Sequence, residues 1–302
     1  METLSLQGTG VALVTPFMPD GTVDHTALAR ITEHVIAGNV DYLVALGTTA
    51  ESVTLSEAET EAVLYTILTT NAGRKPVLVG CGGYNTYEVI RKMASYESKF
   101  IFDGYMSVTP YYNKPSQNGL FEHYKLIAQS TSKPILLYNV PPRTAVNLLP
   151  ETVVKLSHHF PNIIGVKEAS GGLEQGMEII SRVRSDFQVL AGDDVIALPG
   201  LSVGFRGCVS VLANAFPNPI SSMMRFALND FDRVAARQIH YSMLPLFRLA
   251  FKEGNPTGIK AMLNVIGLCG LTVRPPLAQA SEGLVNGIRE AVGLNISEPY
   301  SN

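Results

Sequence analysis

Short apolar runs recur along the first 212 residues of the chain, and amphipathic segments separate them. This alternation is typical of βα units, in which a buried parallel strand is followed by a crossover helix. Eight runs can be counted, at 10–15, 41–47, 76–81, 104–109, 134–139, 162–167, 187–192 and 207–212. Because eight parallel strands close a (β/α)8 barrel, the pattern predicts an α/β fold of this TIM-barrel type.

Polar residues at the expected helix starts support this reading. Ser56 and Glu59 have the spacing of a capping box, and Asn85 and Glu88 repeat that spacing. Pro150 suits the first turn of a helix, where its missing N–H costs nothing. We therefore predict helices between the apolar runs.

The last 90 residues or so contain helical patterns without further strand-like runs, at roughly 216–229, 232–252, 256–267 and 279–293. The first of these completes the barrel, which we place in residues 1–230. Residues 231–302 are then a C-terminal helical extension packed on the barrel. An open doubly wound sheet is the main alternative, but the segment GVALVTPF lacks the glycine-rich nucleotide turn that such a fold usually carries after its first strand.

Composition and charge narrow the class of protein. The chain has 302 residues and 46% apolar content, with 23 basic and 26 acidic side chains scattered without runs of one sign. This balance argues against nucleic acid or an anionic membrane as a partner. Cys81, Cys208 and Cys269 are far apart and indicate reduced core residues, and METLSLQG lacks a secretory pattern, so we expect a cytoplasmic protein.

Lys167 is the clearest candidate for chemistry, because it ends the apolar run NIIGVK and reactive groups of barrels lie at the C-terminal ends of strands. A lysine in a dry environment has its ammonium form disfavoured. A neutral amine can attack a ketone, and the resulting imine draws electrons from the adjacent carbon. A solvated lysine at a strand end is the alternative interpretation.

Other strand ends carry hydroxyls, a phenol and a guanidinium. Tyr138 could transfer protons near Lys167, although a packed tyrosine with a satisfied hydroxyl is the commoner case. Thr48 and Thr49 offer hydroxyls and N–H groups for a small carboxylate, or an ordinary helix cap. Arg143 follows two stiffening prolines and suits a substrate carboxylate, or solvent.

We expect no metal site. Asp193 and Asp194 are adjacent, yet a helix N-cap explains them better than metal binding. The sequence also lacks the CxxC, HxxxH and HxE spacings of common metal sites.

Five segments in order, GTTAES (47–52), VTPYYNKPSQNGL (108–120), YNVPPRT (138–144), GVKEASG (165–171) and AGDD (191–194), resemble the dihydrodipicolinate synthase and N-acetylneuraminate lyase family. The resemblance runs through essentially the whole barrel and implies the same fold. With its arginine, the segment YNVPPRT resembles the synthase branch of this family more than the lyase branch. Synthases of that branch condense pyruvate with L-aspartate 4-semialdehyde on the way to diaminopimelate and lysine.

The resemblance also implies roles. Lys167 would form the imine with pyruvate, with no further cofactor, and Tyr138 would relay protons with Thr48 and with Tyr112 from across a tight dimer interface. Thr49 would hold the pyruvate carboxylate together with Thr48. The carboxylate of the aldehyde substrate would bind Arg143. The pocket would also be lined by main-chain atoms of Gly192 and Val209. A homotetramer of two tight dimers is the implied assembly.

The same resemblance places a possible allosteric cleft for L-lysine at that interface, lined by Ser52, Glu57, Tyr84, Glu88 and Tyr111. Glu57 and Tyr84 depart from the pattern of lysine-inhibited relatives, as does Thr60, and Ala50 replaces a glycine after the two threonines. We therefore expect weak or altered inhibition by L-lysine.

Three other functions remain compatible with the residues. A different pyruvate aldolase, acting on a keto-deoxy sugar acid or N-acetylneuraminate, would keep Lys167 and Tyr138 but not need Arg143. A non-catalytic member that binds a keto acid would be expected to lack part of the proton relay. A pyridoxal phosphate barrel would need a phosphate cradle, for which SGG at 170–172 is the only weak candidate.

Overall fold

The computed structural model describes residues 4–229 and 232–297, with the side chains of 294–297 left out. Eight parallel strands form a closed barrel in which each strand pairs with its neighbours in the sequence and β8 pairs with β1. The strands are β1 (Gly8–Ala12), β2 (Tyr42–Ala45), β3 (Val77–Gly80), β4 (Gly104–Val108), β5 (Ile135–Asn139), β6 (Ile163–Glu168), β7 (Gln188–Ala191) and β8 (Gly207–Ser210). The predicted fold class is confirmed.

The first strand lies earlier than its apolar run suggested. We expected residues 10–15, whereas β1 begins at Gly8, which pairs with Gly207 of β8. Leu13 still donates to the Val44 carbonyl at 3.0 Å, but the N–H of Val14 is taken by the Asn214 side chain at 3.1 Å. A side-chain acceptor therefore ends the ladder while the apolar run continues as a buried loop.

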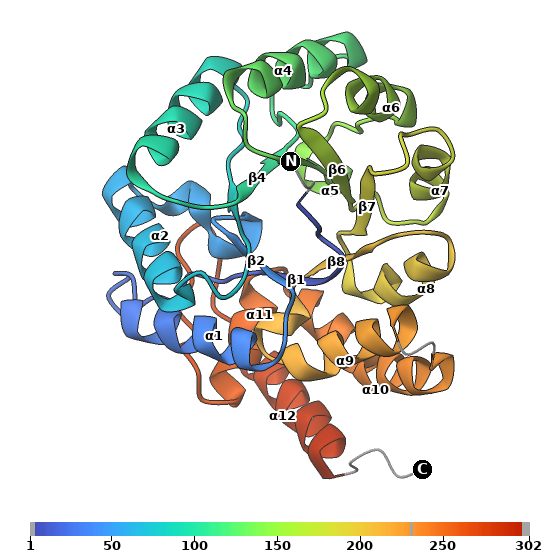
Figure 1. The fold of residues 1–302 in the computed structure, drawn as a ribbon. Helices are drawn as coiled ribbons and strands as arrows, with labels where there is room; N and C mark the ends of the chain where they lie inside the picture. Colours follow the sequence, from blue (N-terminus) through green and yellow to red (C-terminus); the bar gives the residue numbers. More distant parts are fainter. Residues whose placement is uncertain (1–3, 230–231, 298–302) are drawn as a thin grey trace.

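Helices surround the strands (Figure 1). Those of the barrel are α1 (His25–Ala37), α2 (Glu57–Asn71), α3 (Thr86–Lys99), α4 (Gln117–Ser130), α5 (Pro141–Thr144), α6 (Pro150–His159), α7 (Glu174–Ile180), α8 (Ala197–Ser202) and α9 (Pro217–Leu228). The capping box of Ser56 and Glu59 is confirmed at the start of α2, and Pro150 begins α6.

The second predicted capping box is only half formed. Asn85 accepts from the N–H groups of Tyr87 and Glu88, as an N-cap should. The Glu88 carboxylate, however, pairs with Arg91 one turn along the helix instead of returning to the backbone of Asn85. Glu88 thus accepts from the oppositely charged Arg91, three residues away, and not from the backbone N–H of Asn85.

Two apolar clusters form the core. One fills the space between strands and helices. The other lies inside the barrel and includes Leu6, Tyr42, Leu136, Ile164 and Val209. Leu6 belongs to the segment before β1, and its N–H is bonded to the Gln188 side chain at 2.7 Å. The interior of the barrel is therefore packed, which leaves the strand ends as the place for chemistry.

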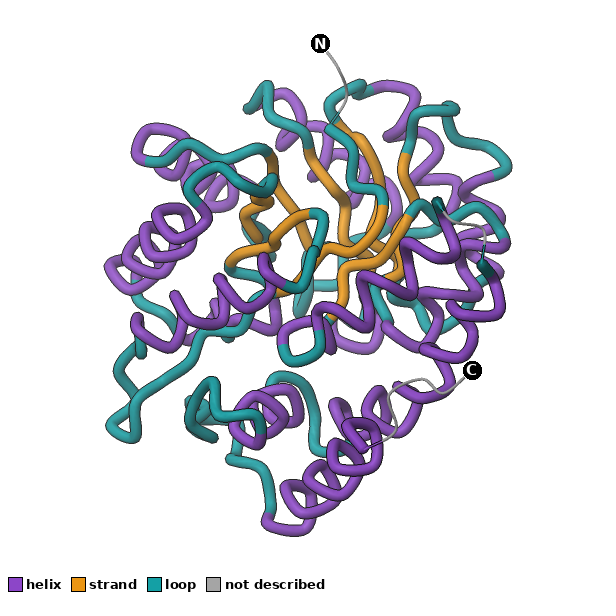
Figure 2. Tube along the Cα trace, turned by 60° about the horizontal axis from the view of Figure 1, so that its bottom comes forward, coloured by secondary structure: helices purple, strands orange, loops and turns teal. Residues whose placement is uncertain are grey.

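The C-terminal helices lie together on one side of the barrel, next to α9 (Figures 1 and 2). They are α10 (Arg233–Phe251), α11 (Thr257–Val265) and α12 (Glu282–Ser297). The last begins at residue 282, not at 279 as we expected, because Ser281 caps its first turn by accepting from Leu284. The predicted boundary after residue 230 falls at residues 230–231, outside the described ranges. Within those ranges, no helix has the length and apolarity needed to cross a membrane.

Candidate active site

A β-bulge in β6 determines where Lys167 points. Ile135 of β5 pairs with Ile163, but the next residue, Leu136, pairs with Gly165, so Ile164 is an extra residue in β6. Ile164 packs inside the barrel, and strict alternation would send Lys167 to the outside. The bulge reverses the alternation. Lys167 therefore pairs with Tyr138 and shares the inward face of the barrel.

The amine of Lys167 lies over the aromatic face of Tyr138, with Nζ 4.2 Å from the ring centroid. Lys167 is 4% exposed. It takes part in none of the nine ion pairs found among the described residues. The structure thus brings together the two residues that the sequence analysis placed nearest the chemistry.

Gly192, directly after β7, leaves space beside this lysine. A Cβ atom at this position would lie 3.2 Å from Cε of Lys167 and 2.6 Å from the Cβ of Ala169. Val209 of β8 is 1% exposed and packs inside the barrel. Both predicted pocket-lining residues therefore lie on the barrel interior or its rim, Gly192 in contact range of the lysine stem.

Thr48 and Thr49 form a single 3-10 turn, η1 (Thr48–Ala50), after β2. Thr48 is partly exposed, whereas Thr49 is 3% exposed. The hydroxyl of Thr49 accepts a hydrogen bond of 3.0 Å from the side-chain amide of Asn255. Because the acceptor side of this hydroxyl is occupied, its proton remains available to a carboxylate.

Arg143 lies in α5, the short helix started by Pro141 and Pro142. Its Nη2 donates to the carbonyl of Asn255 at 3.0 Å, and the side chain is otherwise solvent-accessible. One guanidinium edge therefore anchors the side chain while other N–H groups can bind an anion. Asn255 connects Arg143 with Thr49, a link between the two predicted carboxylate-binding groups.

Tyr112 lies on the surface of this single chain. It is 88% exposed and has a left-handed backbone conformation, with φ 72°. The neighbouring Tyr111 packs edge-on against Tyr84, with ring centroids 5.4 Å apart. A role for Tyr112 in the proton relay remains a prediction that requires a second subunit.

A buried polar network stiffens the ends of β5 and β6. The side-chain amide of Asn139 donates to both carboxylate oxygens of Glu168, at 3.2 and 3.0 Å. Glu168 also accepts from Gln175 at 2.9 Å and from the N–H of Ser170 at 2.7 Å. Since Asn139 and Glu168 follow Tyr138 and Lys167 directly, this network holds the two strand ends together behind the site.

The two aspartates after β7 differ in role, contrary to our single N-cap interpretation. Asp193 is the N-cap that we expected, since its side chain accepts from Val195. Asp194 instead is 2% exposed and accepts from the N–H groups of Val211 and Leu212, both at 3.0 Å. Burial raises the pKa of Asp194, and these hydrogen bonds oppose the shift. No group of three or more metal-ligating side chains occurs among the described residues.

The residues of the predicted allosteric cleft belong to the loops and helix starts that follow β2, β3 and β4: Ser52, Glu57, Tyr84, Glu88 and Tyr111. Tyr84 and Tyr111 are in contact, and the carboxylate of Glu88 is paired with Arg91. Thr60, on the next turn of α2, is buried. Binding of L-lysine to this set stays a prediction.

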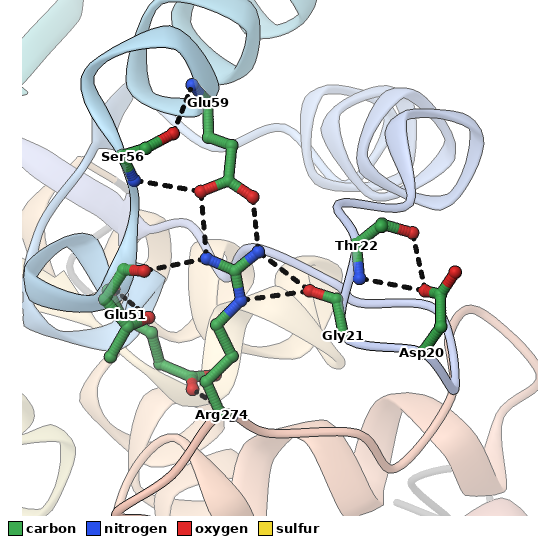
Figure 3. A network of polar contacts seen from close by, with 8 residues as sticks. Asp20, Gly21, Thr22, Glu51, Ser56, Glu59 and Arg274 are labelled. Atoms are coloured by element: carbon green, nitrogen blue, oxygen red, sulfur yellow. Dashed lines mark hydrogen bonds and ion pairs between the residues drawn. The ribbon is translucent and has the colours of Figure 1, made fainter.

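Sequence reasoning missed a set of charged side chains, one pair of them buried, that links the β2–α2 loop to the C-terminal region. Glu51 pairs with Lys260 of α11. The guanidinium of Arg274 pairs with Glu59, as Figure 3 shows. A lysine inside the apolar segment GIKAML was the available signal, because lysine is almost never fully buried without a partner. Asn255 left no such signal.

Surface hollows lie elsewhere. One of about 490 Å³ lies on the outside, lined by residues of α1 and α2 and by Phe100, and one of about 230 Å³ lies near residues 4–7. Neither hollow is lined by a lysine, so the strand ends remain the candidate site.

Comparison with known proteins agrees with this geometry. The Dihydrodipicolinate synthetase family matches residues 5–293. A protein of Flavobacterium psychrophilum named 4-hydroxy-tetrahydrodipicolinate synthase is 46% identical over 92% of this chain and 94% of its own, and one of Azobacteroides pseudotrichonymphae with the same name is 45% identical over 97% and 98%. The solved 4-hydroxy-tetrahydrodipicolinate synthase of Methylacidiphilum fumariolicum superposes with a TM-score of 0.93 at 38% identity, over 97% of both chains. The resemblance noted in the sequence is confirmed, and the chain belongs to the dihydrodipicolinate synthetase family.

Proposed function

We propose that the protein is an enzyme with 4-hydroxy-tetrahydrodipicolinate synthase activity, condensing pyruvate with L-aspartate 4-semialdehyde through an imine on Lys167. The activity is the one that its relatives at 42–46% identity carry in their names. The observation that supports the chemistry most directly is the buried amine of Lys167 over the ring of Tyr138, at the C-terminal end of neighbouring barrel strands.

The proposed reaction begins when the neutral amine of Lys167 attacks C2 of pyruvate, and water leaves as the imine forms. Loss of a proton from C3 then gives an enamine, because the imine nitrogen accepts the electron pair. The enamine carbon attacks the aldehyde carbon of the second substrate, whose oxygen takes up a proton. The amino group of that substrate finally attacks the imine carbon, which closes the ring and releases Lys167.

The other residues bind and orient these groups. Thr49, with its acceptor side held by Asn255, donates its proton to the pyruvate carboxylate, and Thr48 does so beside it. Tyr138 transfers protons to and from the carbonyl oxygen in a relay with Thr48 and with Tyr112 of a second subunit. Arg143 binds the carboxylate of the aldehyde through the guanidinium edge that Asn255 leaves open.

The active enzyme is an oligomer. Tyr112 is 88% exposed in one chain, which fits a residue that completes the site of a neighbouring subunit. A tight dimer is then the minimal active unit, and two dimers form a homotetramer. The enzyme works in the cytoplasm on small molecules, and no cofactor takes part because the imine with Lys167 supplies the electron sink.

The test is a coupled assay. Purified protein receives pyruvate and L-aspartate 4-semialdehyde, and an added dihydrodipicolinate reductase reports the product as NADPH oxidation. We expect pyruvate-dependent oxidation from the native protein, a borohydride-trapped adduct with pyruvate on Lys167, and neither from Lys167→Ala. Turnover by Lys167→Ala would refute the mechanism. Trapping without turnover would instead point to a sugar-acid aldehyde as the substrate, and an absence of both would point to a non-catalytic protein.

A further inference from the structure

The turn that carries Thr48 and Thr49 is followed by a residue in a strained conformation. Glu51 ends η1 with φ 52° and ψ 32°, the left-handed region that residues other than glycine and asparagine seldom adopt. The backbone N–H of Glu51 closes the turn by donating to the carbonyl of Thr48 at 3.1 Å. The position of Thr48 and Thr49 therefore depends on whatever keeps Glu51 in this conformation.

The side chain of Glu51 is held by the C-terminal region. One carboxylate oxygen pairs with Nζ of Lys260, and the other accepts from the backbone N–H of Arg274 at 2.9 Å. The side chains of Glu51 and Lys260 are 1% and 0% exposed. Lys260 also donates to the carbonyl of Thr272 at 3.0 Å and lies 4.1 Å from the ring centroid of Phe17. The pair is thus fully buried and has additional partners on the lysine side.

Stability alone is a weak explanation for such a pair. Desolvation of two buried charges often cancels their attraction, and apolar residues of similar volume can be equally or more stabilising. Burial does lower the pKa of Lys260, and the neighbouring Glu51 only opposes that shift. What the pair supplies is a defined position for a carboxylate attached to a strained backbone.

A second contact between the same two segments lies close by in the sequence. Asn255, five residues before Lys260, donates to Thr49, and its carbonyl accepts from Arg143. The segment 255–260 therefore holds the threonine turn at two points. Asn255 contacts the hydroxyl of Thr49, and Lys260 holds Glu51, whose backbone follows the turn.

We propose that Glu51 and Lys260 are positioning residues, whose buried pair keeps the Thr48–Thr49 turn in the orientation that binds the pyruvate carboxylate within reach of Lys167. The inference rests on the proposed function and adds to it a dependence of pyruvate binding on the C-terminal helical region. It concerns pyruvate and not the aldehyde, because Arg143 is held by the carbonyl of Asn255 and is neither hydrogen-bonded to nor ion-paired with Glu51.

The chain offers a matched control for the test. Glu59 is another carboxylate of the network in Figure 3, where it pairs with the guanidinium of Arg274 and not with the turn. Glu51→Gln and Glu59→Gln make the same chemical change within one network. Glu51 itself ends the turn after Thr48 and Thr49, whereas Glu59 is connected to the turn only indirectly, through Arg274.

The experiment measures borohydride trapping of the full-length protein at increasing pyruvate concentration, together with both KM values and the melting temperature. For Glu51→Gln we expect the half-saturating pyruvate concentration to rise about tenfold or more, with the KM for the aldehyde within about twofold of native. Lys260→Met should raise the pyruvate value similarly, and Lys260→Arg should restore part of the native value because it keeps the positive charge. Glu59→Gln should leave the pyruvate value unchanged.

Two results would overturn the inference. One is a Glu51→Gln protein that melts at a lower temperature but is half-saturated at the native pyruvate concentration. The other is a Glu59→Gln protein with the same increase as Glu51→Gln. If Glu51→Gln does not fold, Glu51→Asp, which moves the carboxylate by one methylene, carries the same expectation and the same refutation. Native protein that pyruvate cannot trap would instead refute the proposed function, so the two failures are distinguishable.

Discussion

Replacing Gly192 by alanine tests how closely the rim of the barrel is fitted around Lys167. The added Cβ would lie 2.6 Å from Cβ of Ala169, 3.0 Å from the carbonyl oxygen of Glu168 and 3.2 Å from Cε of Lys167. The first distance is shorter than real Cβ atoms show, and the second involves backbone. Something must therefore move, and the lysine stem is the flexible neighbour.

The expected cost follows from these contacts. Overpacking of this kind destabilises proteins by roughly 1–3 kcal/mol, which for a chain of this size lowers the melting temperature by a few degrees, on the order of 2–10 °C. A displacement of a reacting group by about 1 Å can cost about 100-fold in rate. We therefore expect kcat of Gly192→Ala to fall about 10- to 100-fold in a protein that is still folded at 25 °C.

The assay is the reductase-coupled reaction, with borohydride trapping of Lys167 at saturating pyruvate as a measure of imine formation. Gly172→Ala is the matched control, because a Cβ at Gly172 meets no atom within 4 Å. It should retain native kcat and melting temperature. A Gly192→Ala protein with kcat within twofold of native would refute the argument that the rim constrains the lysine. Equal losses in both variants would show that the effect is not specific to the site.

Three further predictions concern other parts of the chain. Tyr138→Phe should lower kcat about 10²- to 10⁴-fold with little change in melting temperature, because it removes only the proton-transferring hydroxyl; native kcat in this variant would exclude the relay. Burial lowers the pKa of His123 to about 4, so the folded protein binds this proton only below that pH, whereas the unfolded chain binds it near pH 6.5. Because the unfolded chain then gains a proton that the folded protein does not, the free energy of unfolding is unaffected above pH 6.5 and falls by roughly 3 kcal/mol as pH decreases to about 4. Urea unfolding from pH 4.5 to 7.5 should show a shallower decline of this free energy for His123→Gln, and identical slopes would contradict the assignment. L-lysine should inhibit weakly in a steady-state titration, and strong cooperative inhibition would show that Glu57 and Tyr84 still form a working cleft.

Local patterns in the sequence were enough to predict the architecture. Each of the eight apolar runs corresponds to a strand, and the cap at Ser56 is formed as its spacing indicated. These features depend on neighbouring residues, since periodicity and capping act over a few positions. The same locality explains the errors. Whether Val14 continues a strand depends on Asn214, 200 residues away, and whether Glu88 completes a capping box depends on its competition with Arg91.

The candidate site divides in the same way between local and distant causes. Lys167 and Tyr138 could be singled out because each ends an apolar run, which is a property of the sequence by itself. Their meeting inside the barrel depends on the bulge at Ile164, since one extra residue reverses which side of the strand faces inward. The supports of the threonine turn, Asn255 and Lys260, lie more than 200 residues from it and meet it only because the C-terminal helices pack beside the barrel. The sequence determined which groups are present and which elements carry them, and the tertiary structure decided which groups face one another, because that depends on closure of the barrel and on contacts with no local pattern.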